Sequence, residues 1–220
     1  MAGFDYAALV ELEPEAYATL RLNRPAWNVI EGDLYQFGGS PYEGVDLLAG
    51  GVPCPPFSKV DKQLGAEDVR DLFSEALRLV DECLPQTVML ENVRGLLDVI
   101  FDDYRVRVES HLRKLGYVPG WWLLNASDFG VSQLCPRVVF VAVRKNFASG
   151  FSWLEPCRTV PPAVGDLLHD LMGANGWHGV GLWREKARGI VPMLVGSSKK
   201  HGGSDLGPAR ARKSVFLQKS

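Results

Sequence analysis

Strand-like and helix-like segments alternate along the first two thirds of this chain, and this alternation constrains its fold more than any other feature. Short apolar runs predict strands at 6–10, 27–30, 45–52, 87–90, 121–124 and 138–143. Amphipathic stretches predict helices at 14–22, 72–84 and 104–115. We expect the last two strands to form a hairpin pair. The alternation indicates an α/β fold, with a mainly parallel sheet and helices on both faces.

Ligands of such sheets bind beyond the carboxyl ends of the strands, so the residues that follow each strand are informative. Four predicted strands are followed by an acid or a thiol, at Glu11, Asp33, Cys54 and Glu91. One polar residue after a strand means little, but four at the same edge indicate a site. We therefore expect these four side chains to line one rim of the sheet.

Bulk properties argue against several classes of protein. The 220 residues are 46% hydrophobic and 23% charged, which is ordinary for a globular domain with a small appendage. No apolar run approaches the roughly 20 residues of a membrane span, and the first residues do not resemble a signal peptide. The four cysteines form no Cys-x-x-Cys pair, and no histidines stand at ligand spacing. We expect a cytoplasmic protein with no membrane segment and no metal.

The periodic pattern ends near residue 147, after which proline and glycine become frequent. We expect a first domain over residues 1–147 and a small irregular lobe over 148–220. The net charge is −2, yet basic residues outnumber acids locally. Between Arg184 and Lys213 the basic residues are Arg184, Lys186, Arg188, Lys199, Lys200, Arg210, Arg212 and Lys213, against the acids Glu185 and Asp205. A polyanion partner requires such an excess, although a solvated tail is the simpler interpretation of charge alone.

The segment around Cys54 carries the most specific signal. Pro53, Pro55 and Pro56 flank this cysteine in a loop that follows a predicted buried strand. A lone cysteine usually packs in a core, but that interpretation fits poorly between three prolines. The order Pro-Cys-Pro-Pro-Phe-Ser resembles the catalytic loop of the DNA cytosine-5 methyltransferases.

Further motifs of that family follow in the same order. Residues 91–93 (Glu-Asn-Val) resemble one motif, and the stretch from Gln133 to Arg137 resembles its Gln-x-Arg-x-Arg motif. Residues 11–14 and 32–33 resemble its two cofactor-binding strand ends. The chain therefore resembles a DNA cytosine-5 methyltransferase of bacterial restriction–modification systems over roughly residues 1–145. The resemblance implies an S-adenosylmethionine-dependent, Rossmann-like methyltransferase sheet and a target-recognition region over the lobe at 148–220.

The resemblance also implies roles for particular residues in the reaction. Cys54, next to Pro53, would add as a thiolate to C6 of cytosine, so that C5 can take a methyl group. Glu91, next to Asn92, would hold a proton at N3 of the base. Arg137 would bind the ring oxygen. The target base would have to be flipped out of double-stranded DNA.

The same resemblance assigns the cofactor and the DNA. Glu11 would accept hydrogen bonds from the ribose of S-adenosylmethionine, and Asp33 from the adenine amino group. Leu12 and Leu72 would pack against adenine. The alternative, purely structural interpretations are an acid at a helix N-terminus for Glu11 and a turn residue for Asp33. The DNA-binding residues would be Ser58, Gln133, Lys199, Lys200, Arg210 and Arg212, and we expect the protein to act as a monomer.

The sequence also departs from the family pattern. It begins after the family's opening strand and Gly-rich turn, and it ends before the closing motifs, so we expect a fragment cut at both ends. The sheet would lack its first strand, leaving an exposed edge. Cys135 replaces the first Arg of the Gln-x-Arg-x-Arg motif, and Ser132 replaces a usual Pro. These departures put activity in question. Two alternatives stay open, a non-catalytic remnant that binds DNA and a tRNA cytosine-5 methyltransferase.

Overall fold

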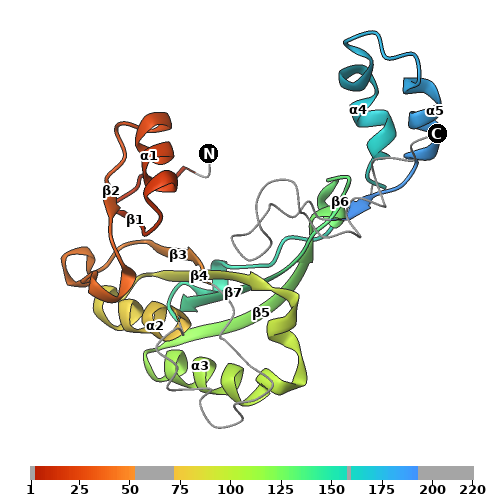
Figure 1. Ribbon diagram of the computed structural model, residues 1–220. Helices are drawn as coiled ribbons and strands as arrows, with labels where there is room; N and C mark the ends of the chain where they lie inside the picture. Colours follow the sequence, from red (N-terminus) through yellow and green to blue (C-terminus); the bar gives the residue numbers. More distant parts are fainter. Residues whose placement is uncertain (1–2, 53–71, 158–159, 193–220) are drawn as a thin grey trace. The chain divides into compact units, whose positions relative to one another are not determined.

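The computed structural model describes residues 3–52, 72–157 and 160–192 (Figure 1). The calls on Pro53, Cys54 and Ser58, and on the basic residues from Lys199 on, lie outside these ranges. The chain forms two compact units. The first contains the residues up to Trp122 together with Val138–Ser152, and the second contains Leu123–Arg137 and the residues from Trp153 on. The boundary after residue 147 stays a prediction.

The main sheet has four strands in the order β3-β4-β7-β5. These are β3 (Leu47–Gly51), β4 (Thr87–Val93), β5 (Tyr117–Asn125) and β7 (Pro136–Arg144). Strands β3 and β4 are parallel. The two predicted strands near the end of the periodic region are neighbours in the sheet, as expected, although β5 is longer than the apolar run that predicted it. Its first residues, Tyr117 to Gly120, include a proline and a glycine that interrupt the sequence pattern.

The first two strands form a separate sheet. Strand β1 (Leu9–Glu11) pairs in parallel with β2 (Val29–Glu31), and α1 (Pro14–Asn23) connects them. Helix α1 begins at the predicted Pro14, a position where the missing N–H costs nothing. Among the described residues, β1 and β3 each pair with one strand only. The expected single rim is therefore divided, with Glu11 and Asp33 on the small sheet and Glu91 on the large one.

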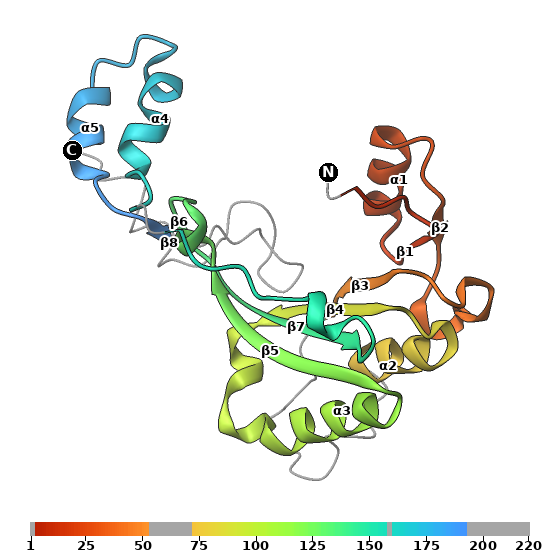
Figure 2. The ribbon, with the colours of Figure 1, turned by 180° about the vertical axis from the view of Figure 1, so that it is seen from behind.

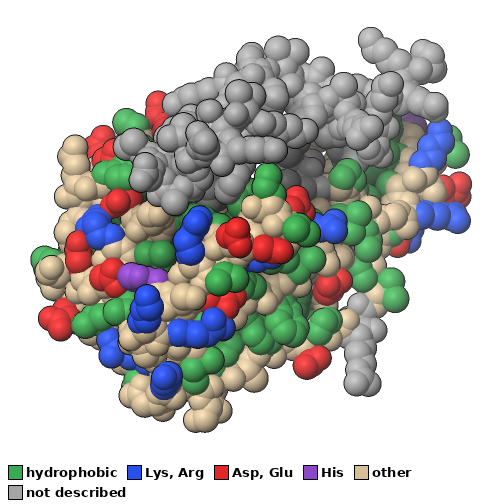
Figure 3. Space-filling model, turned by 90° about the horizontal axis from the view of Figure 1, so that it is seen from below, with side chains coloured by type: hydrophobic (Ala, Val, Ile, Leu, Met, Phe, Trp, Pro, Cys, Tyr) green, Lys and Arg blue, Asp and Glu red, His purple; other side chains and the backbone are tan. Residues whose placement is uncertain are grey.

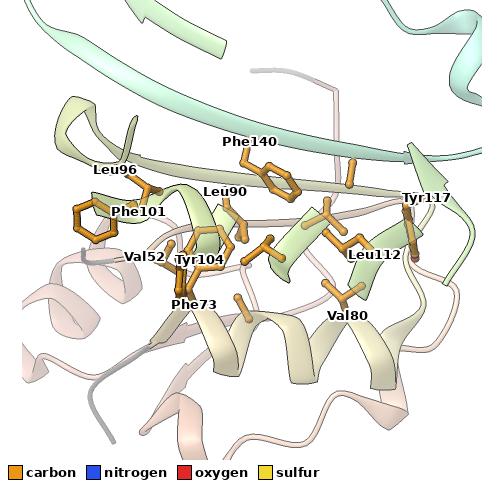
Figure 4. Packing of buried hydrophobic residues seen from close by; sticks show 14 residues of the cluster. Val52, Phe73, Val80, Leu90, Leu96, Phe101, Tyr104, Leu112, Tyr117 and Phe140 are labelled. Carbon is orange, nitrogen blue, oxygen red and sulfur yellow. The ribbon is translucent and has the colours of Figure 1, made fainter. Parts of the chain in front are cut away.

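Two helices cover one face of the four-stranded sheet, α2 (Leu72–Cys83) and α3 (Asp102–Lys114) (Figures 1 and 2). Both follow the predicted ranges closely, because their apolar residues recur at helical spacing. In α2 the buried residues are Phe73, Ala76, Leu79, Val80 and Cys83. Phe73, Ala76 and Val80 belong to one core cluster with fully buried residues of the strands and of α3, including Leu90, Leu112, Tyr117 and Phe140 (Figure 4).

Three aromatic side chains, Phe73, Trp121 and Phe140, pack together in this core. The Phe73 ring lies 6.0 Å from Trp121, which lies 4.4 Å from Phe140, measured between centroids. Gly116 follows Leu115, the C-cap of α3, with a φ of 87°, a left-handed conformation that glycine adopts without strain. In the view of Figure 3, Lys and Arg side chains are interspersed with Asp and Glu on the described surface. In this view the described residues therefore show a mixture of both charge signs.

Short 3-10 helices form several connections in the described ranges. They are η1 (Leu34–Gln36), η2 (Ser40–Tyr42), η3 (Arg94–Leu97), η4 (Val99–Phe101), η5 (Ala126–Phe129) and η6 (Ala148–Gly150). The segment η1–η2 packs against α2. Within the described ranges, the longest helices are too short or too polar to cross a bilayer.

The second unit is more regular than its sequence predicts. Strand β6 (Gln133–Leu134) pairs in parallel with β8 (Val191–Pro192), and α4 (Val164–Gly173) packs against α5 (Val180–Lys186). Two helices and a short strand therefore stand within residues 148–192, where the sequence predicted an irregular lobe, and the part of that prediction that concerns residues 193–220 lies outside the described residues. The glycines lie at helix ends and contacts: Gly176 turns the chain with a φ of 74°. A Cβ at Gly165 would stand 2.6 Å from the carbonyl oxygen of Arg184, so glycine permits the close approach of the helices.

Candidate active site

The carboxyl ends of β3 and β4 lie side by side, with Gly51 opposite Glu91 in the parallel register. Because side chains alternate along a strand, Leu90 and Asn92 enter the core while Glu91 lies on the other face of β4. A Cβ added to Gly51 would lie 3.6 Å from Glu91 Oε2. The carboxyl of Glu91 therefore reaches the end of β3, two residues before Pro53.

Asn92 connects the same two strands from the core side. Its side chain is 3% exposed, and Nδ2 donates a hydrogen bond to the carbonyl oxygen of Val52 at 3.0 Å. The backbone N–H of Val93 donates to Asn92 Oδ1 at 2.8 Å. The amide thus satisfies buried polar groups and holds the residue from which the chain continues to Pro53 and Cys54. Sequence reasoning grouped Asn92 with the catalytic residues, and the structure shows this anchoring contact.

Arg137 and Gln133 belong to the second unit. Arg137 is the second residue of β7, and its Nη1 donates to the carbonyl oxygen of Pro136 at 3.1 Å. Gln133 begins β6. The two residues that depart from the family pattern have local roles here. Ser132 is buried and donates from its hydroxyl to the carbonyl of Pro162, while the carbonyl oxygen of Cys135 accepts from Ala126 N at 3.4 Å.

The structure brings Glu11 and Asp33 to the carboxyl ends of neighbouring parallel strands. Glu11 Oε1 accepts from the backbone N–H of Glu13 at 2.8 Å, and Asp33 Oδ1 accepts from that of Tyr35 at 3.0 Å. Each of these two contacts uses only one oxygen of its carboxylate, Oε1 of Glu11 or Oδ1 of Asp33. Two half-buried acceptors at one strand edge fit the hydroxyl and amino donors of a nucleoside.

The two leucines predicted to contact the cofactor differ in position. Leu12 follows β1 and is 59% exposed, whereas Leu72 is half-buried as the first residue of α2. Sequence reasoning missed two residues near this region, Arg78 and Glu82, whose side chains bind the segment after Asp33. The charge spacing of Glu75, Arg78 and Glu82 along α2 was visible, but it reads as an ordinary helix-surface pattern.

The second unit contains an open pocket of about 850 Å³ between α4 and α5. Its charged and titratable lining residues are Asp166, His169, His178, Arg184, Glu185 and Arg188. Arg184 Nε donates to Asp166 Oδ1 at 2.7 Å, and both side chains are half-exposed. Within the described ranges, His, Cys, Asp and Glu do not gather in groups of three that could hold a metal ion.

Comparison with known proteins agrees with the motifs. The family model described as C-5 cytosine-specific DNA methylase matches residues 1–199. The type II methyltransferase M.NgoMIV of Neisseria gonorrhoeae is 57% identical over 198 residues, which are 90% of this chain and 64% of the relative. M.NaeI of Lentzea aerocolonigenes is 52% identical over 215 residues, which are 96% of this chain and 52% of the relative. The chain thus spans between half and two thirds of these curated relatives.

Solved structures show the same fold. A putative DNA modification methyltransferase encoded within a prophage of E. coli superposes with a TM-score of 0.62 at 25% identity, covering 76% of this chain and 49% of that one. Spodoptera frugiperda DNMT2 superposes with a TM-score of 0.58 at 23% identity, covering 72% and 50%. The fold is therefore that of the S-adenosylmethionine-dependent methyltransferases. With its Glu-Asn-Val motif at the end of β4 and a family match over most of its length, the chain belongs to the C-5 cytosine-specific DNA methylases.

Proposed function

We propose that this chain is the catalytic part of a type II methyltransferase that methylates C5 of cytosine in double-stranded DNA within a restriction–modification system. One observation carries the proposal: the Glu91 carboxyl reaches the end of β3, and Asn92 binds Val52 there, immediately before the Pro53-Cys54 pair. In this proposal the Glu91 carboxyl and the Cys54 thiol both contact the same pyrimidine. The match to relatives named type II methyltransferases supports the DNA substrate.

The residues act in a definite order in this proposal. The Cys54 thiolate forms a bond to C6 of the flipped cytosine while N3 receives a proton from Glu91. The electron pair displaced from the C5–C6 bond makes C5 nucleophilic. Once C5 carries the methyl group, the C5 proton passes to solvent and the Cys54 thiolate leaves C6. The N3 proton then returns to Glu91. Arg137 would stabilise negative charge at the ring oxygen.

The cofactor of this reaction is S-adenosylmethionine, which supplies a methyl group activated by its sulfonium. Glu11 would hold the ribose hydroxyls and Asp33 the adenine amino group, from the ends of β1 and β2. Leu12 and Leu72 would pack against adenine. Ser58 and Gln133, which belong to the matching motifs, would contact the DNA. Lys199, Lys200, Arg210 and Arg212 would neutralise phosphates.

A covalent trap tests the proposal. The chain is incubated with S-adenosylmethionine and duplex DNA that carries 5-fluorocytosine, from which the substituent at C5 cannot leave. We expect an adduct that survives denaturation, that Cys54→Ala abolishes, and that the matched control Cys157→Ala retains, since Cys157 is a free, exposed cysteine. DNA binding without an adduct would instead establish a non-catalytic remnant. An adduct with 5-fluorocytosine tRNA and none with DNA would establish the tRNA-methylating branch.

A further inference from the structure

Two side chains of helix α2, Arg78 and Glu82, form hydrogen bonds with the backbone of the segment that follows Asp33. Arg78 Nη2 donates to the carbonyl oxygens of Leu34 and Phe37, each at 3.0 Å. Glu82 Oε2 accepts from the backbone N–H of Gly39 at 2.6 Å. These partners precede the helix by about forty residues in sequence. The contacts therefore fix a loop to a helix, and they do more than stabilise the helix itself.

The guanidinium of Arg78 is itself oriented by two acids. Its Nε lies 2.7 Å from Glu75 Oε2, and its Nη1 lies 2.6 Å from Glu82 Oε1. Glu82 keeps its charge because the Gly39 N–H, and then Arg78, hold the pKa of its carboxyl below the ordinary value. A planar fork can serve two carboxylates and two carbonyls together, which a lysine ammonium on a flexible stem cannot reproduce.

Gly39 lets the loop approach α2 closely. This residue is buried, and a Cβ added to it would lie 2.7 Å from Cys83 Sγ and 3.1 Å from Glu82 Cβ. Cys83 Sγ donates to the carbonyl oxygen of Gly39 at 3.3 Å, and Gly44 N donates to the carbonyl oxygen of Cys83 at 2.7 Å. The loop is therefore held at both the start and the end of its path along the helix.

Asp33 belongs to the same rigid turn. It is the N-cap of η1, since its Oδ1 accepts from Tyr35 N and its carbonyl oxygen accepts from Gln36 N, each at 3.0 Å. Arg78 binds the carbonyl of Leu34, the first residue of η1, and that of Phe37, which caps its end. A shift of the Arg78 guanidinium would move this turn, and with it the Asp33 carboxylate.

We propose that Arg78 and Glu82 are positioning residues for cofactor recognition: they set the Asp33 turn so that its carboxylate meets the amino group of adenine. This inference rests on the proposed function, which assigns Asp33 to that amino group. It extends that assignment to two residues on α2 that lie far from Asp33 in sequence and need not touch the cofactor.

The test compares two ligands that differ at the position Asp33 would read. Binding of S-adenosylhomocysteine and of S-inosylhomocysteine, which has a carbonyl in place of the amino group, is measured by ligand-observed NMR titration. We expect the wild-type chain to prefer the adenine ligand by about tenfold, as a hydrogen bond to a charged group allows. Arg78→Lys and Glu82→Gln should bring this preference close to one, and Asp33→Asn should do the same.

The control is Arg113→Met, which removes an arginine from an equivalent i,i+4 pair with Glu109 on α3. It should leave the ratio unchanged, and thermal melting identifies any variant that fails to fold. Faster hydrogen exchange of the Gly39 amide in Glu82→Gln would show that the loop is released. If the wild type lacks the adenine preference, the assignment of Asp33 fails and this inference with it. If the wild type and Asp33→Asn behave as expected but Arg78→Lys and Glu82→Gln keep the preference, the inference alone is overturned.

Discussion

The two sheets of this protein support their predicted site carboxylates in different ways. Glu91 stands on β4, a strand whose neighbours Leu90 and Asn92 are buried in a core made with α2 and α3. Glu11 ends β1 and Asp33 follows β2, two three-residue strands connected by α1, a helix with no buried residue. The first region is held by packing, and the second by hydrogen bonds to a loop. Mutations that disturb the core should therefore cost stability, whereas mutations around Asp33 should mainly alter ligand recognition.

The largest expected effect is on the free energy of unfolding, which should depend on core packing in the region of the large sheet and little on α1. Phe73 is fully buried and packs against Tyr104, Trp121 and Phe140. Phe73→Ala should lower the free energy of unfolding by about 3–5 kcal/mol, because it leaves a cavity. Leu22→Ala on α1, where the side chain is 82% exposed, should change it by less than about 0.5 kcal/mol. Urea unfolding of both variants measures the difference, and equal losses would contradict the comparison.

The second prediction concerns the hydrogen bond that joins the strand ends. Asn92→Ala leaves the buried carbonyl of Val52 without the 3.0 Å bond from Nδ2, which should cost about 1–3 kcal/mol. The rate of adduct formation with 5-fluorocytosine DNA should fall as well, because Val52, from which the chain continues to Cys54, loses this hydrogen bond. Urea unfolding and a time course of adduct formation measure the two effects. Unchanged adduct formation would mean that this anchor has no part in the reaction.

The third prediction uses pH to examine the loop region. The Gly39 N–H and Arg78 lower the pKa of Glu82 from its ordinary value of 4.5. A lowered folded-state pKa means that the unfolded chain binds the proton more tightly, so the stabilisation is present above about pH 4.5 and disappears as pH falls through the folded pKa. The melting temperatures of wild type and Glu82→Gln should thus differ at pH 7 and converge in acid. A constant difference would show that charge on Glu82 is not involved.

The smallest effect is expected in the second unit. Arg184 and Asp166 form an ion pair at 2.7 Å, but both side chains are 52% exposed. Exposed pairs contribute little, so Arg184→Met should change the free energy of unfolding by less than about 1 kcal/mol. The same substitution lowers the basic charge of the unit and should weaken binding to duplex DNA, with a smaller salt dependence than the wild type. Fluorescence anisotropy at two salt concentrations tests this, and an unchanged salt dependence would exclude a phosphate contact.

Local patterns were enough to predict the three helices of the first unit. Helices α1 and α3 begin and end within two residues of the predicted ranges, and α2 ends within one residue, because amphipathic spacing, Pro14 and Gly116 act over one or two turns. The helices α4 and α5 were missed, since the glycines around them read as loop signals. Their positions at helix ends, and the close contact at Gly165, depend on how the two helices pack.

The sequence by itself determined the family and predicted the chemistry, because the Pro-Cys and Glu-Asn-Val motifs consist of neighbouring residues and are recognised without distant contacts. Only the tertiary structure decided how the acids are supported. The hydrogen bonds that Arg78 and Glu82 make with the loop after Asp33 join segments about forty residues apart, and the strands divide into two sheets. Such contacts depend on where the chain places its elements in space, and no local pattern of residue types specifies that.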